Sequence, residues 1–364
     1  QNDILKEFIA QKEWIYPPRD HMRIITDTIE FCTNEMPQFN TVSVSGYHIR
    51  EAGSTAAQEL AFTLLDGFCY VEHAIERGID IDKFAPRLSF FFNSHLDFLE
   101  EIAKFRAARR IWARHMKEKY GAKDSRSWKL RFHTQTAGCS LTAQQPEVNI
   151  ARTAFQAMAG VLGGTQSLHT NSMDETLALP SKKAAEIALR TQQIIAYETG
   201  VANVVDPLGG SWYIESLTDE LEKEAKEYFE KVEKMGGVIP ALEEGFFQRE
   251  IARASFDYEK KVNENSRIVV GVNDFIKEDE EIEIPILEIG LEAEEKQKAD
   301  LVKLRENRDQ AMVDACLNRV EEISREGGNL VPPIVEAAKV DATMGEIVDA
   351  MKKVFGEWTE TPVL

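Results

Sequence analysis

Short β-like runs alternate with long helical stretches over the first 200 residues, and this alternation constrains the fold more than any other feature. The runs are Asn40–His48, Arg87–Phe92, Lys129–Gln135 and Gly164–His169. Between two of them, residues 95–116 carry apolar side chains at near-helical spacing. Strands that alternate with amphipathic helices are typical of parallel β/α architecture.

The spacing of the runs favours a barrel. His48, Ser89, His133 and His169 mark them at intervals of 41, 44 and 36 residues, enough for one strand, one helix and two loops each. A doubly wound open sheet would give similar spacing, but it usually shows a glycine-rich phosphate turn, and neither G-x-G-x-x-G nor G-x-x-x-x-G-K-[ST] occurs. We therefore expect a (β/α)8 barrel.

The sequence changes character near residue 200. A turn cluster at residues 206–211 precedes charged helical stretches at Thr218–Met235 and Ala293–Arg325. A short β-like patch, Arg267–Val272, and an acidic linker near Ile276–Glu283 interrupt them. We expect residues 1–200 to belong to the barrel and residues 201–364 to form a mainly helical extension.

Composition excludes several classes of protein. The 43 Lys and Arg against 62 Asp and Glu give a formal charge of −19, which repels nucleic acid and anionic membranes. The four cysteines stand far apart, so we expect no zinc site, iron–sulfur cluster or disulfide framework. Apolar runs are too short for a membrane span, which predicts a soluble, cytoplasmic protein.

All seven histidines lie at or before residue 169, and three of them end a β-like run. In a barrel the carboxyl ends of the strands face the active site, so polar groups there are candidates for chemistry. The candidates are Tyr47, His48, Arg87, Ser89, His133, Gln135, Gln166 and His169. The alternative for each is a structural role, as a core aromatic or a satisfied hydrogen bonder.

The candidate set is rich in neutral hydrogen bonders and poor in acids. No Ser-His-Asp signature, H-E-x-x-H motif or carboxylate pair accompanies it. Such a site fits an enzyme whose cofactor performs the difficult step while the protein orients and shields the substrate.

Several longer motifs resemble one family. They are QNDILKE at 1–7, SGYHIREAG at 45–53, FAPRLSF at 84–90, GGTQSLHTN at 163–171 and VGVN at 270–273. In this order they resemble the methylmalonyl-CoA mutase family, and the resemblance covers essentially the whole chain. It implies the C-terminal part of a (β/α)8 barrel, about strands four to eight, followed by the helical extension.

The resemblance also implies an activity. Members of this family are adenosylcobalamin-dependent acyl-CoA mutases, isomerases that rearrange a carbon skeleton by a radical 1,2-shift. His48 resembles the histidine that hydrogen-bonds the substrate thioester carbonyl, and Tyr47 the aromatic wedge beside the corrin. The implied substrate-binding residues are Gln1, Gln11, Gln38, Arg87, Leu88 and Ser89. The implied cofactor-binding residues are Tyr47, Glu51, His133, Gln135, Cys139, Gln166, His169, Glu175 and Thr176.

Three departures bear on the substrate. Gln11 stands where methylmalonyl-CoA mutases carry an arginine that binds the free carboxylate of the substrate. An amide cannot form the same charge-assisted bidentate hydrogen bonds. Gln38 replaces a lysine of some members, and Cys139 a tryptophan of many. The pattern is similar to the isobutyryl-CoA and 2-hydroxyisobutyryl-CoA mutases. A true methylmalonyl-CoA mutase and a non-catalytic structural barrel subunit remain the alternatives.

The cobalt-ligating motif of the family, D-x-H-x-x-G, is absent from this sequence. We therefore expect no metal ligand in this chain and a histidine of another domain or subunit on cobalt. The implied partners are the acyl-CoA substrate, a small cobalamin-binding subunit and a G-protein chaperone, within a hetero-oligomer. We also expect further sequence upstream of Gln1.

Overall fold

The computed structural model describes residues 2–279 and 290–360, and these contain one four-stranded parallel sheet. Its strands, in spatial as well as chain order, are β1 (Ser43–Ser45), β2 (Ser89–Ser94), β3 (Phe132–Thr136) and β4 (Ser167–His169). The expected parallel β/α architecture is confirmed. Gln1 lies outside the described residues, as does part of the acidic linker expected at 276–283.

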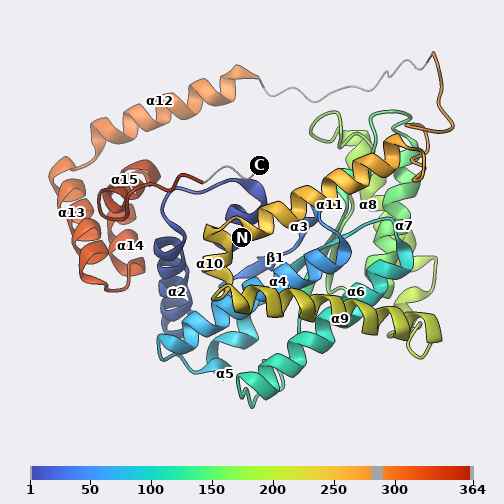
Figure 1. Cartoon of the computed structure of the whole chain (residues 1–364). Helices are drawn as coiled ribbons and strands as arrows, with labels where there is room; N and C mark the ends of the chain where they lie inside the picture. The colour runs from blue at the N-terminus through green and yellow to red at the C-terminus, as the bar shows by residue number, and fades with distance from the viewer. Residues whose placement is uncertain (1, 280–289, 361–364) are drawn as a thin grey trace.

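Helices precede, separate and follow the strands (Figure 1). Before β1 come α1 (Ile4–Lys6), a π-helical turn η1 (Glu7–Gln11) and α2 (Pro18–Glu35). Between strands lie α3 (Tyr47–Glu51), α4 (Ala56–Glu76), α5 (Ile81–Phe84), η2 (Ala85–Arg87), α6 (Phe98–Arg114), η3 (His115–Lys119), η4 (Gly138–Ser140) and α7 (Val148–Leu162). After β4 come α8 (Lys182–Tyr197), η5 (Val201–Asn203), α9 (Trp212–Lys234), α10 (Val238–Glu243), α11 (Phe246–Asn263), α12 (Leu291–Asn307), α13 (Gln310–Glu326), α14 (Val331–Lys339) and α15 (Met344–Phe355).

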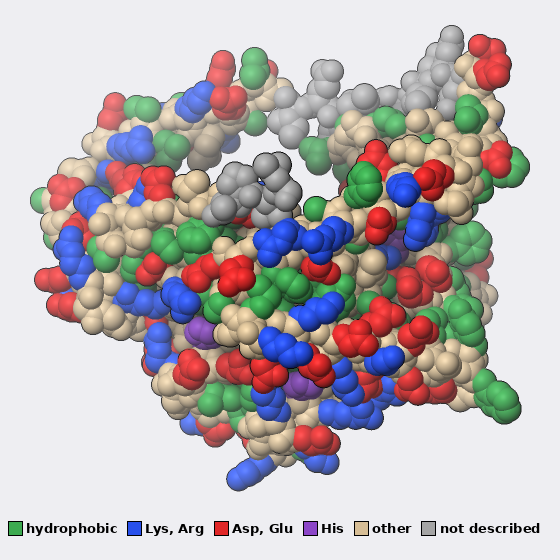
Figure 2. All heavy atoms as spheres, viewed as in Figure 1, with side chains coloured by type: hydrophobic (Ala, Val, Ile, Leu, Met, Phe, Trp, Pro, Cys, Tyr) green, Lys and Arg blue, Asp and Glu red, His purple; other side chains and the backbone are tan. Residues whose placement is uncertain are grey.

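The outer surface of these helices is highly charged. Figure 2 shows acidic and basic side chains interspersed over the face that carries α9 and α11, which is typical of a solvated helical layer. Within the described residues, no helix has the length and apolar character that crossing a bilayer would require.

One face of the sheet packs against α4 and α6 through aromatic side chains. Phe90 lies edge-on to Trp112 at 4.8 Å between ring centroids, and Phe105 stacks on Phe132 at 5.0 Å. At Gly67 of α4, an added Cβ would lie 3.1 Å from the Phe90 ring and 3.2 Å from Trp112. The helix therefore approaches the sheet closely because residue 67 has no side chain.

The helices after β4 divide between two apolar clusters. Residues of α9, α10 and α11 are buried in the same cluster as the strands, whereas α13, α14 and α15 form a second cluster with Tyr16. Arg23 of α2 joins the second cluster to the rest by donating to the backbone oxygens of Ile323, Ser324 and Gly328. The division expected near residue 200 stays a prediction.

Three expected elements differ in the structure. The run at 40–48 is a strand only over Ser43–Ser45, because the chain turns at Gly46 and Tyr47 and His48 begin α3. The stretch at 293–325 is two helices, since the Asp309 side chain caps the second by accepting from the backbone N–H of Ala311 and Met312.

The patch at 267–272 is the third difference. It forms a single bridge between Val270 and Asp274 instead of a strand. The Asn273 side chain accepts from Val269 N and donates to Val262 O and Arg267 O, which closes a local loop.

A buried ionic cluster lies between α4, α6 and β2. The Lys104 ammonium donates to Glu59 Oε2 at 2.6 Å, to the backbone oxygen of Asn93 at 2.9 Å and to Glu101. The side chains of Lys104, Glu59 and Glu101 are fully buried. Removing the ammonium would leave Glu59 without its ion-pair partner and Glu101 with only the longer contact to Arg50, at 3.8 Å.

We therefore expect Lys104→Ala to lower the free energy of unfolding of the full protein by about 3–5 kcal/mol, measured by denaturant titration. The matched control is Lys226→Ala, which breaks an ion pair of a half-exposed lysine with Glu222 and should cost no more than about 0.5 kcal/mol. Equal effects of the two substitutions would contradict this assignment.

Candidate active site

The second face of the sheet carries polar side chains in register. Ser45 lies beside Phe91, Phe91 beside His133, and His133 beside Ser167. The His133 Nδ1 and Ser167 Oγ atoms are 2.7 Å apart. Because side chains alternate between the faces of a strand, this row points away from the aromatic core.

A second row lies nearer the carboxyl edge, where Asn93, Gln135 and His169 are neighbours. The two rows border a hollow of about 420 Å³ lined by Ser43, Phe91, His133, Gln135, Leu168 and His169. Burial lowers the pKa of His133 and of His169. The hollow therefore presents neutral hydrogen bonders at neutral pH.

Tyr47 closes the carboxyl edge of the hollow. Its ring stacks on Phe91 at 4.9 Å with an interplanar angle of 4°, and its hydroxyl accepts a hydrogen bond from Gln135 Nε2 at 2.8 Å. Gln135 also donates to Asn171 Oδ1 at 2.8 Å. Burial raises the pKa of Tyr47, so its hydroxyl stays protonated.

His48 lies beside Tyr47 at the start of α3. Its Nδ1 is 2.8 Å from Ser45 Oγ, and its ring meets Phe91 edge-on at 5.7 Å. Burial, and then the charge of Lys6, lower the pKa of His48 to about 4. His48 is therefore a neutral imidazole at physiological pH, able to donate or accept but carrying no charge.

Gly46 allows this placement of α3. An added Cβ would lie 2.1 Å from Thr63 Oγ1 and 2.9 Å from Glu59 Cγ. Its N–H donates to the Phe91 oxygen, and its own oxygen accepts from Arg50 N. The glycine thus ends the strand and starts the helix that carries Tyr47 and His48.

Glu51, the last residue of α3, binds the turn after β3. Its Oε1 accepts from Asn93 Nδ2 and Gly138 N at 2.7 and 2.9 Å, and its Oε2 from Cys139 N at 2.8 Å. Burial raises the pKa of Glu51 and that of the neighbouring Cys139 thiol. Glu175 and Thr176 lie exposed in the turn that follows β4.

Four predicted residues lie at the opposite, amino end of the sheet. Leu88 and Arg87 precede β2, Ser89 is its first residue, and Arg87 donates to Gln38 at 2.8 Å. Gln166 precedes β4, and its side chain binds the backbone of Phe132 and Gly164. Arg87, Ser89 and Gln166 were grouped with the candidates at the carboxyl ends of the strands, and the structure places them at the opposite end; their roles remain predictions.

Gln11 belongs to the π-helical turn η1. Its Oε1 accepts from the buried Lys6 ammonium at 2.7 Å, and Lys6 also pairs with Glu7 at 2.8 Å. The turn η1 packs against α3, which carries His48, so η1 lies on the His48 side of the site.

Comparison with known proteins gives one family. The family model described as methylmalonyl-CoA mutase matches residues 1–357. The chain belongs to the methylmalonyl-CoA mutase family.

The chain is about equally similar to several members of the family. The chain is 47% identical over its full length to the 2-hydroxyisobutanoyl-CoA mutase large subunit of Aquincola tertiaricarbonis, of which it covers 65%. It is 48% identical over its full length to the methylmalonyl-CoA mutase of Rhizobium meliloti (strain 1021), of which it covers 51%. Identity to the Escherichia coli (strain K12) methylmalonyl-CoA mutase is 46% over 98% of the chain and 50% of that protein. The chain thus spans about half to two thirds of these mutases.

Some residues of the site in this mutase-family chain were not predicted. Phe91, Asn93, Asn171 and Ser45 hold Tyr47, Glu51, Gln135 and His48 in place. The period of two could have identified Phe91 and Asn93, since they share a face with the predicted Ser89. Asn171 lies two residues after the predicted site residue His169, beyond the end of β4. The alternation of side chains along a strand cannot identify a site residue there.

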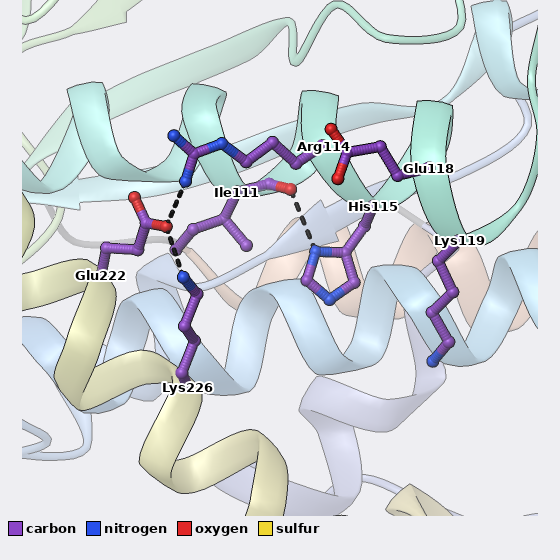
Figure 3. A pocket seen from close by; sticks show the side chains of 7 residues that line it. All are labelled: Ile111, Arg114, His115, Glu118, Lys119, Glu222 and Lys226. Carbon is purple, nitrogen blue, oxygen red and sulfur yellow. Dashed lines mark hydrogen bonds and ion pairs between the residues drawn. The ribbon is translucent and has the colours of Figure 1, made fainter.

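A second hollow, of about 210 Å³, lies between α6 and α9 (Figure 3). Glu222 binds Arg114 and Lys226 there, at 2.6 and 2.7 Å. His115 stacks on Phe68 at 4.3 Å, and its Nδ1 is 3.1 Å from Ile111 O. These groups are engaged with one another on the outer helical layer, so the sheet face remains the candidate site.

The neutral state of His48 gives a prediction. Lys6→Met should raise the pKa of His48 above about 4, and burial should keep it below the usual 6.5. Between these values the unfolded chain binds more protons than the folded one, so His48 lowers stability as the pH falls through that window.

The measurement is an NMR titration of the histidine ring signals. Lys298→Met, on the exposed helix α12, is the control and should leave the His48 titration unchanged. An unaltered or lower His48 pKa in Lys6→Met would show that the ammonium does not act on this ring.

Proposed function

We propose that this chain is the substrate-binding part of an adenosylcobalamin-dependent acyl-CoA mutase that acts on a short branched acyl-CoA, isobutyryl-CoA or 2-hydroxyisobutyryl-CoA. The observation that carries the proposal is the neutral His48 imidazole beside Tyr47 at the carboxyl edge of a polar sheet face. A neutral donor suits a thioester carbonyl, whose oxygen needs a hydrogen bond without full proton transfer.

The proposal includes a (β/α)8 barrel, of which the four strands are a part. The polar face of the sheet would then point toward the barrel axis, and the aromatic face toward the surrounding helices. Partly buried residues on the polar face, such as His133 and Gln135, support the barrel. Their neutral polar side chains are typical of the lining of a binding site, whereas an outer surface is usually charged.

The two ends of the sheet suit the two ends of an acyl-CoA. At the amino end, Arg87 and Gln38 form a polar pair next to Ser89, which suits the polar part of coenzyme A. At the carboxyl edge, His48 suits the thioester. The extended ligand would run along the polar face between them.

The residues at the carboxyl edge fit a large polar cofactor. A Cβ at residue 138 would lie 3.0 Å from Glu51 Oε2 and 3.5 Å from the Tyr47 hydroxyl, so the missing side chain lets these two polar groups gather at the turn. Tyr47, Glu51, Gln135 and Glu175 would line the adenosylcobalamin there. When bound, the cofactor supplies homolysis of a cobalt–carbon bond. The chain's own residues hold the thioester, place the tyrosine ring beside it and exclude water.

The acyl pocket is the basis for the choice of substrate. Gln11 offers an amide whose oxygen is already bound by Lys6, so its N–H groups remain for the ligand. An amide accommodates an apolar or hydroxyl-bearing acyl group but gives a free carboxylate no charge-assisted bidentate contact. Methylmalonyl-CoA is therefore the weaker candidate.

The proposed partner is a small cobalamin-binding subunit. One similar protein is named as a large subunit, and the sequence lacks the cobalt-ligating motif. A G-protein chaperone and a hetero-oligomeric assembly complete the proposal.

Activity tests the proposal directly. The full protein with its small subunit and adenosylcobalamin should isomerise isobutyryl- or 2-hydroxyisobutyryl-CoA with a kcat/KM roughly 10- to 100-fold above that for methylmalonyl-CoA. Gln11→Arg should shift this ratio toward methylmalonyl-CoA, whereas Gln297→Arg on the exposed α12 should not. If methylmalonyl-CoA is the best substrate, the inference from Gln11 is wrong. No turnover of any acyl-CoA would leave the structural-subunit alternative.

A further inference from the structure

We propose that Ser45 is a positioning residue that fixes the tautomer of His48, with the proton on Nε2. The inference rests on the proposed function and extends it, because it states which ring nitrogen meets the thioester carbonyl. It is carried by the contact between Ser45 Oγ and His48 Nδ1 at 2.8 Å.

The direction of this hydrogen bond follows from counting hydrogens. Ser45 is fully buried, and among the described residues His48 Nδ1 is the one hydrogen-bond partner of its hydroxyl. If Nδ1 carried the proton, it would donate to Ser45 Oγ and the hydroxyl hydrogen would have no acceptor. A buried donor without a partner is costly, whereas an oxygen with an unused lone pair is not. Ser45 therefore donates to Nδ1.

The neutral state of the ring makes the tautomer matter. A neutral imidazole has one N–H, and the hydrogen bond at one nitrogen decides which nitrogen carries it. With Nδ1 accepting from Ser45, the proton lies on Nε2, which makes no hydrogen bond to the described residues. Nε2–H is then the free donor of the site.

Ser45 is itself held rigidly. Its backbone N–H donates to Asp3 Oδ2 at 2.7 Å, and the Tyr70 hydroxyl donates to Asp3 Oδ1 at 2.5 Å. Asp3 and Tyr70 are both buried. The backbone of Ser45 is thus fixed against the chain segment before α1 and the helix α4, which places its hydroxyl within hydrogen-bond distance of His48 Nδ1.

The consequence concerns the ligand chemistry. A fixed Nε2–H matches an acceptor such as a thioester carbonyl oxygen, and it disfavours a ligand that offers only a donor at this point. Without the serine hydroxyl, both tautomers become populated, and the fraction of sites ready to donate falls.

The test compares Ser45→Ala and Ser45→Cys with the parent protein. Ser45→Cys fills the position with a slightly larger side chain and replaces the hydroxyl with a weak donor, so the two variants together separate loss of the hydrogen bond from loss of packing. Ser127→Ala is the matched control, since it removes another fully buried serine hydroxyl. The Ser127 hydroxyl donates to Asp82, and both residues are far from His48 in the sequence.

The first readout is 15N NMR of the full protein without substrate or cofactor, with labelled histidine and the His48 signals assigned from His48→Gln. The parent and Ser127→Ala should show Nε2 protonated, and both Ser45 variants a mixture of tautomers. A parent ring protonated on Nδ1, or Ser45 variants with the parent's tautomer, would overturn the proposal.

The second readout is turnover of isobutyryl-CoA and 2-hydroxyisobutyryl-CoA by the full protein with its small subunit and adenosylcobalamin. Both Ser45 variants should lose roughly five- to tenfold in kcat with little change in KM. An unchanged kcat alongside a mixed tautomer would overturn the positioning role. If neither acyl-CoA is turned over while the NMR result is as expected, the proposed function fails and the tautomer assignment stands.

Discussion

The Lys104 ammonium joins the elements on which the site is built. It binds Glu59 of α4, Glu101 of α6 and the backbone oxygen of Asn93 in β2. Glu59 Oε1 in turn accepts from Asn93 N at 2.7 Å, and the Asn93 side chain holds Glu51. A cation buried among these groups therefore fixes the end of β2 relative to α3 and to the turn at Gly138.

The two faces of the sheet have different surroundings. Phe90, Phe92 and Phe132 bury one face against the helices, while Phe91, His133 and Gln135 line the hollow on the other face. Because the same backbone carries both sets, the packing that stabilises the sheet also sets the distances between polar groups. Burial keeps the histidines of that face neutral, so they act as hydrogen bonders.

Much of this arrangement could be predicted from the sequence. The alternation of apolar runs and amphipathic helices gave the parallel architecture, because the periods of strand and helix differ. The carboxyl-edge positions of Gln135 and His169 followed from their places late in the runs. Arg87 and Ser89 stand first in their run, so their position predicts the amino end of the sheet, and the grouping of both with the carboxyl-edge candidates was wrong.

Other features depend on contacts that no local pattern encodes. The turn at Gly46 is decided by Thr63 and Glu59, which lie one helix further along the chain. Glu51 binds Gly138 and Cys139, which are separated from it by 87 and 88 positions in the sequence. The hydrogen bond between Ser45 and Asp3 joins residues that are 42 positions apart. Such long-range hydrogen bonds position the site, and they become visible only when the chain is folded.

A crystal structure of the full protein with bound isobutyryl-CoA tests the central claim most directly. The ligand should lie along the polar face of the sheet, with its thioester oxygen about 2.6–3.2 Å from His48 Nε2. A ligand bound elsewhere, or a thioester oxygen that meets another residue while His48 faces away, would contradict it.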